Sequence, residues 1–192
     1  MPTSVLLVSL AALAAGCVSL RSAPPRFADA WPPAQSGPRP TVVLVVTGVA
    51  AVDGLPLDPG PILDAWGAQS ERAYRESALF SDVLVGRGRG DARVEVALRA
   101  ELSDIPVLSV LSNLTLLVIP HVDTTDIAMT TRVTSAEGQP LGTVEVRGRS
   151  RTWYQLLLFP FAGLFEPRTV TPEIVYDLNR QTIATLHARG VF

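Results

Sequence analysis

Cys17 is the only cysteine of the 192-residue chain, and the residues before it indicate a chemical role for its thiol. Residues 5–15 are almost entirely Val, Leu and Ala, a run typical of an export signal and too short to span a bilayer. Ala14, Ala15 and Gly16 follow this pattern with small side chains, which fit the groove of a signal peptidase. A thiolate at this position is suited to attack a lipid donor, because it is a far better nucleophile than a hydroxyl group.

The string Leu13-Ala-Ala-Gly-Cys17 resembles the lipobox of bacterial prolipoproteins. The resemblance implies that Cys17 receives a diacylglyceryl thioether, that the chain is cut before it, and that the new amino group is acylated. One acyl chain holds a protein only marginally, at about 0.8 kcal/mol per buried methylene, whereas several chains anchor it firmly. Two features depart from the family pattern: Ala14 stands where Leu is commonest, and no Lys or Arg lies between Met1 and Cys17.

Val18 follows the cysteine in place of the Asp that favours inner-membrane retention in enterobacterial lipoproteins. The resemblance therefore implies a lipid-anchored protein on the periplasmic side of the outer membrane. The chain then divides into a signal peptide over 1–16, a lipidated, Pro-rich tether over 17–40 and a single periplasmic domain over 41–192. The six prolines of residues 18–40 predict a semi-rigid, extended spacer, and a free linker is favoured over docking of Phe27 or Trp31.

Composition excludes several classes of site. No second cysteine is present, so neither a disulfide framework nor a cysteine-based metal site is expected. The 16 basic residues nearly balance the 18 acidic ones, which gives no support to nucleic-acid binding. Neither His121 nor His187 has a carboxylate or thiol at the spacing typical of metal ligands, and no nucleophile motif is present. We therefore expect no metal, no cofactor and no enzyme.

Hydrophobic periodicity predicts an α+β domain. Apolar and charged residues alternate over 92–102, as in a strand with one wet face, and two further strands over 126–134 and 141–153 flank a turn-rich loop. We also predict a doubly buried strand over 41–49, a loop over 50–61, a helix over 62–79, a short strand over 83–85 and a final helix beginning with Thr171 as N-cap. These elements predict a mainly antiparallel sheet of about five strands with helices packed on one face.

This order of elements is similar to that of periplasmic lipoprotein domains related to the curli-secretion lipoprotein and the amino-terminal domain of the Tol-system protein TolB. Three pieces carry the resemblance: Ala78-Leu-Phe-Ser-Asp-Val83 at a helix exit, the strand over 92–102, and Arg132-Val-Thr-Ser-Ala-Glu-Gly138 at the end of a strand. It covers about residues 41–151. The resemblance implies this fold and a role in the envelope, with no catalytic residues to carry over.

Two apolar segments, over 105–119 and 153–165, flank the predicted hairpin, and neither is long enough to span a membrane. We expect both to pack on the sheet as core. The alternative is an exposed surface for lipid or a partner, since aromatic side chains are favoured at interfaces. In the second segment these residues are Trp153, Tyr154, Phe159, Phe161 and Phe165.

Arg147, Arg149 and Arg151 alternate along one predicted strand and therefore project from one face, with Trp153 continuing the row. They are candidates for binding lipid phosphates or the carboxylates of a partner, although a solvated strand face is the favoured interpretation.

These observations predict a non-catalytic binding or accessory module of envelope assembly, transport or secretion, attached to the membrane and binding another envelope protein. The alternative is a lipid-contacting or pore-associated oligomeric subunit that inserts segments 105–119 and 153–165.

Overall fold

The computed structural model describes residues 17–21, 31–34, 37–115, 118–155 and 167–192, and the account below is confined to them. Its elements, in chain order, are β1 (Cys17–Arg21), β2 (Thr41–Val52), β3 (Leu55–Leu57), α2 (Gly60–Glu76), β4 (Asp82–Val85), β5 (Ala92–Ser103), α3 (Pro106–Leu114), β6 (His121–Ser135), β7 (Pro140–Tyr154) and α4 (Pro167–Ala188). The predicted signal segment, Phe27, Phe159, Phe161 and Phe165 lie outside these ranges.

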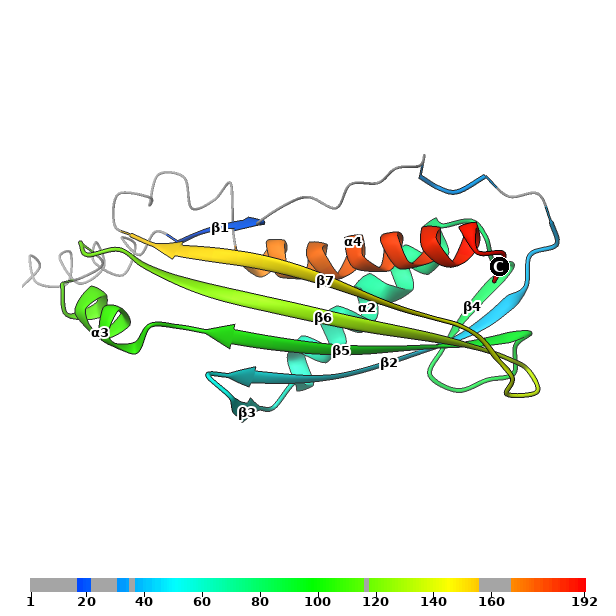
Figure 1. The fold of residues 1–192 in the computed structure, drawn as a ribbon, viewed down its shortest axis with the longest axis horizontal. Helices are drawn as coiled ribbons and strands as arrows, with labels where there is room; N and C mark the ends of the chain where they lie inside the picture. The colour runs from blue at the N-terminus through cyan, green and yellow to red at the C-terminus, as the bar shows by residue number, and fades with distance from the viewer. Residues whose placement is uncertain (1–16, 22–30, 35–36, 116–117, 156–166) are drawn as a thin grey trace, which may run out of the picture.

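One long, twisted sheet forms the body of the molecule, with α2 and α4 side by side on one face (Figure 1). Its strand order is β1-β7-β6-β5-β2-β3, and β4 pairs with β2 as well. Strand β2 runs parallel to β4 and β5, whereas the other pairs are antiparallel. The predicted α+β class is thus confirmed, and β1 and β3 extend the expected five strands to seven in the described chain.

The core lies between the sheet and these two helices. In β5, Val94, Val96 and Leu98 are at most 2% exposed, and the residues between them face solvent, so the predicted alternation is confirmed. Trp66 and Tyr74 of α2 are buried in the same cluster as the apolar residues of α4. No helix in the described ranges is long and apolar enough to cross a bilayer.

Two strand glycines let the helices approach the sheet closely. A Cβ atom on Gly48 of β2 would lie 2.6 Å from Cζ3 of Trp66, and one on Gly148 of β7 would lie 2.6 Å from Cγ2 of Ile174 in α4. Both separations are far below van der Waals contact. Glycine at these positions therefore sets how closely α2 and α4 pack.

Several boundaries differ from the predictions. The segment expected to be a loop over 50–61 contains a hairpin, since Asp53 and Gly54 both have positive φ angles and turn β2 into β3. Helix α2 ends at Glu76 rather than at 79, because Ala78 adopts a left-handed conformation with φ 56°. Helix α4 begins at Pro167, so Pro172 lies inside it and Thr171 is not its N-cap.

The predicted spacer is not free along its whole length. Residues 17–21 form β1 and pair antiparallel with the edge of β7, and Ser19 Oγ lies 2.7 Å from Thr152 Oγ1. Trp31 packs against the core, with the guanidinium carbon of Arg180 4.8 Å from its ring centroid. The reason is that β7 would otherwise present unpaired backbone groups at its edge, and β1 satisfies them.

Candidate functional site

The sequence-predicted site residues that the structure brings together lie at one end of the sheet. Cys17 of β1 is the register partner of Tyr154 in β7, and Tyr154 is also the register partner of His121 in β6. These residues form one row across the ends of three neighbouring strands, at the start of β1 and β6 and at the end of β7. Helix α3 lies at this same end of the molecule, and the C-terminus lies at the opposite end (Figure 1).

Helix α3 presents its apolar side chains to the outside. Val107 is 69% exposed, Val110 58% and Leu114 75%, whereas Ser112 is fully buried and Ser109 is half-buried. Residues 106–114 contain no charged side chain. Ser112 is the only buried residue of α3, so the helix exposes its apolar side chains, whereas a water-exposed helix normally buries them.

The prediction that residues 105–119 pack as core is consequently wrong for the part that the structure describes. Ile105, Val118 and Ile119, which flank the helix, are exposed as well. In the described chain the core cluster is built from the sheet, α2 and α4, and it includes no residue of α3. The alternative interpretation, an exposed apolar surface, agrees with this geometry.

Helix α3 has defined ends. The Asp104 carboxylate accepts a hydrogen bond from the Ile105 backbone N–H at 2.6 Å, immediately before the first turn. At the other end, the Thr115 hydroxyl lies 2.9 Å from the Leu111 carbonyl and accepts from the Ile119 N–H at 3.2 Å. These bonds satisfy groups that helix ends leave unpaired.

A polar cluster lies beside α3 and involves residues on both sides of it in the chain. Ligand-type atoms of Asp104, His121 and Asp123 all lie within 4.8 Å of one another. Nε2 of His121 is 3.7 Å from Oδ1 of Asp123, with the two side chains 8% and 15% exposed. The ring of His121 stacks on that of Tyr154, with a centroid distance of 4.4 Å and an interplanar angle of 5°.

The electrostatics of this cluster are unfavourable for a free carboxylate. Burial, and after it the negative charge of Asp104, raises the pKa of Asp123 above its ordinary value. The charge of His121 and a hydrogen bond from Tyr154 oppose this rise in pKa. The buried Oδ1 of Asp123 and Nδ1 of His121 have no hydrogen-bond partner in the described chain.

Sequence reasoning missed this cluster because it placed the start of β6 at residue 126, whereas the strand begins at His121. Alternate residues of a strand share a face, so His121 and Asp123 point the same way. The signal was therefore the His-x-Asp spacing itself. Asp104 could not be found this way, since only the pairing of β5 with β6 brings it to the same end.

The predicted arginine row lies on the face of the sheet that the helices leave open. Arg147 bonds to Glu145 at 2.9 Å, and Arg149 makes two bonds to Asp126 at 2.5 and 3.0 Å. Arg151 has no acidic partner among the described residues, and Trp153 beyond it is 39% exposed. Tyr154 does not continue this row, because it stacks on His121 on the other face.

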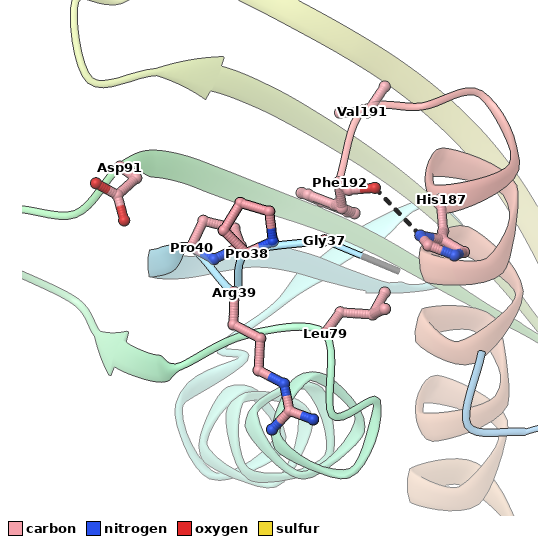
Figure 2. A pocket seen from close by; sticks show the side chains of 9 residues that line it. All are labelled: Gly37, Pro38, Arg39, Pro40, Leu79, Asp91, His187, Val191 and Phe192. Carbon is pink, nitrogen blue, oxygen red and sulfur yellow. Dashed lines mark hydrogen bonds between the residues drawn. The ribbon is translucent and has the colours of Figure 1, made fainter. Parts of the chain in front are cut away.

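A cavity lies at the opposite end of the molecule, where residues 37–40 meet α4 and the C-terminus. This cavity of about 570 Å³ is lined by Leu79, Val191 and Phe192, among others. Figure 2 shows His187 at its wall, with Nδ1 3.1 Å from the Phe192 oxygen. The Asp91 carboxylate there accepts a hydrogen bond from the Thr41 backbone N–H at 2.7 Å.

No family model and no curated protein matches this chain. Among solved structures, it is similar to a PelC dodecamer from Paraburkholderia phytofirmans, with 8% sequence identity and a TM-score of 0.36. The alignment covers 85% of this chain and 96% of the other.

Proposed function

We propose that the chain is an envelope lipoprotein, held through acylated Cys17 on the periplasmic side of the outer membrane. Its domain acts as a non-catalytic binding module in envelope assembly, transport or secretion. The observation that carries the proposal is Cys17 itself, the only thiol in the chain, which follows an apolar export-type segment and the small residues 14–16.

The geometry around Cys17 supports this proposal. The register of β1 with β7 puts the cysteine in the same row as Tyr154, at the end of the sheet where α3 lies. Acyl chains on Cys17 would hold this end at the membrane, next to the exposed side chains of α3. The cavity beside Phe192 would then face away from the bilayer.

The open face of the sheet is the surface that we assign to a partner protein. Arg151 and Trp153 lie exposed on alternate positions of β7, and Arg149 presents a carboxylate-paired guanidinium beside them. An anchored domain reaches a high local concentration at the membrane, so weak contacts from such a face suffice for binding.

A second candidate function is favoured by one observation, the outward-facing apolar side of α3. In this alternative the chain is a lipid-contacting or pore-associated subunit that oligomerises and inserts segments 105–119 and 153–165. The two candidates predict different behaviour of a processed chain carrying Cys17→Ser. A binding module is a soluble monomer, whereas an inserting subunit requires detergent.

Metabolic labelling with a palmitate analogue tests the anchor. The full-length protein is expected to carry the label, and Cys17→Ser is expected to lose it. Val18→Ser is the matched control, since it changes the neighbouring residue but keeps the sulfur, and it should remain labelled. An unlabelled wild-type protein, or label retained after Cys17→Ser, contradicts the proposal.

A further inference from the structure

The cluster of Asp104, His121 and Asp123 has the composition of a metal site. It combines two carboxylates with one imidazole, a set of oxygen and nitrogen ligands that Zn²⁺ accepts. The hard cations Ca²⁺ and Mg²⁺ prefer oxygen alone, so the imidazole of His121 disfavours them. The three residues leave at least one coordination position for water or another ligand.

The orphaned atoms point to a missing ligand. His121 is 7% exposed, its Nδ1 has no hydrogen-bond partner, and its Nε2 faces Oδ1 of Asp123 at 3.7 Å, which is longer than a hydrogen bond. Asp123 Oδ1 is itself buried without a hydrogen-bond donor. Buried polar atoms in folded proteins almost always have partners, so the unpartnered Nδ1 of His121 and Oδ1 of Asp123 leave one ligand-type atom on each residue for a further group.

The distances suit one ion after the side chains rotate toward each other. At metal–ligand distances of about 2.0 to 2.2 Å, two ligands of one tetrahedral Zn²⁺ lie about 3.4 Å apart. The ligand-type atoms of the cluster all lie within 4.8 Å of one another, so side-chain rotation that moves them by about an ångström brings them to this separation. A divalent cation would also neutralise the two carboxylates, whose like charges repel each other at this separation.

The position of the cluster in the chain indicates a structural role for a bound ion. Asp104 immediately precedes the α3 segment and binds the Ile105 N–H, and His121 is the first residue after it, at the start of β6. One ion bound by both residues would tie the two ends of segment 105–120 together and fix α3 relative to the sheet.

We propose that Asp104, His121 and Asp123 bind one divalent transition-metal ion, best matched by Zn²⁺, which clamps helix α3 to the end of the sheet. This site is independent of the proposed anchor, because none of its ligands is Cys17. Labelling of Cys17 and metal binding can therefore succeed or fail separately.

The test uses the full-length protein, purified in detergent from membranes and stripped with a chelator. Calorimetric titration with Zn²⁺ alone is expected to show one equivalent bound. Asp104→Asn, His121→Asn and Asp123→Asn are each expected to weaken binding by about tenfold or more. Two matched controls keep wild-type affinity: Asp126→Asn, a carboxylate on the other face of β6, and His187→Gln, the other histidine.

A second measurement does not depend on how the variants fold. In the wild-type protein, Zn²⁺ is expected to slow proteolysis within residues 105–120 and to raise the thermal midpoint, and a chelator reverses both. Absence of saturable Zn²⁺ binding, or binding that His121→Asn leaves unchanged, overturns the proposal. Titration with Co²⁺ checks the ligands, since a thiolate-to-cobalt charge-transfer band would assign the ion to Cys17 instead.

Discussion

Replacing the outward-facing residues Val107, Val110 and Leu114 of α3 with Ser tests whether this helix contacts lipid. The three side chains are 69%, 58% and 75% exposed. If α3 contacts lipid, the triple variant removes apolar surface that the membrane would cover. If the same side chains packed in the interior, the variant would instead lose its fold.

The expected magnitude follows from these exposed fractions. Complete burial of a Val or Leu side chain is worth about 1.5 to 3 kcal/mol. The exposed fraction of each residue then contributes about 1 to 2 kcal/mol, and the lower limit for all three is about 3 kcal/mol. Because about 1.4 kcal/mol corresponds to a tenfold change, membrane affinity should fall by about two orders of magnitude.

The assay is co-sedimentation with vesicles of phosphatidylethanolamine and phosphatidylglycerol. The processed chain carries Cys17→Ser in every sample, so that acyl chains do not mask the contribution of α3. A matched control replaces two exposed apolar residues at the opposite end of the sheet, Val85 at the end of β4 and Leu141 near the start of β7, with Ser. This control should partition like the parent chain.

Two results would refute the reasoning. Unchanged partitioning of the α3 variant would show that its apolar side does not contact lipid. A loss of several kcal/mol in the free energy of unfolding would show that these side chains are core, since substitutions on an exposed surface usually change stability by less than about 0.5 kcal/mol each.

Two further predictions concern the scaffold. Gly48→Ala should destabilise the protein by about 1 to 3 kcal/mol in urea unfolding, because the new methyl group would meet the Trp66 ring. Gly67→Ala in α2, with open space around it, should stabilise by about 1 kcal/mol, and equal effects would contradict the close-packing argument. The hydrogen bond with Arg72, and next that with Tyr176, lowers the pKa of Glu76. The ionised carboxylate therefore stabilises the fold at any pH above its unfolded pKa, and this contribution is lost as the pH falls through the folded pKa. Glu76→Gln should therefore lower the free energy of unfolding by about 0.5 kcal/mol at neutral pH, since the Arg72–Glu76 ion pair is largely exposed. In acid the variant and the wild-type protein should be equally stable. A difference in stability that persists at low pH would show that charge is not its origin.

Local patterns in the sequence were enough to predict the strands β2, β4, β5, β6 and β7. The alternation of β5 and the turn residues between β6 and β7 were predicted correctly, because side-chain direction in a strand repeats every two residues whatever the strand packs against. The hairpin turn at Asp53-Gly54 was missed although this dipeptide favours such turns. That error was one of interpretation, since the information was local.

The candidate site was predictable only in part. Cys17 stands out by residue type and context, and the face of Arg147, Arg149 and Arg151 follows from strand periodicity. The roles of Cys17 and of these arginines stay predictions. Docking of β1 on β7 had no comparable signal, because it depends on a strand edge that exists only in the assembled sheet.

By itself, the sequence determined the α+β class, the alternating faces of the long strands and the single thiol behind an apolar leader. These properties depend on residues close together in the chain. Only the tertiary structure decided that α3 turns its apolar side outward and that Asp104 meets His121 and Asp123. The physical reason is that burial of a helix face depends on which elements pack against it, and in the described chain the core is built from the sheet with α2 and α4, without α3.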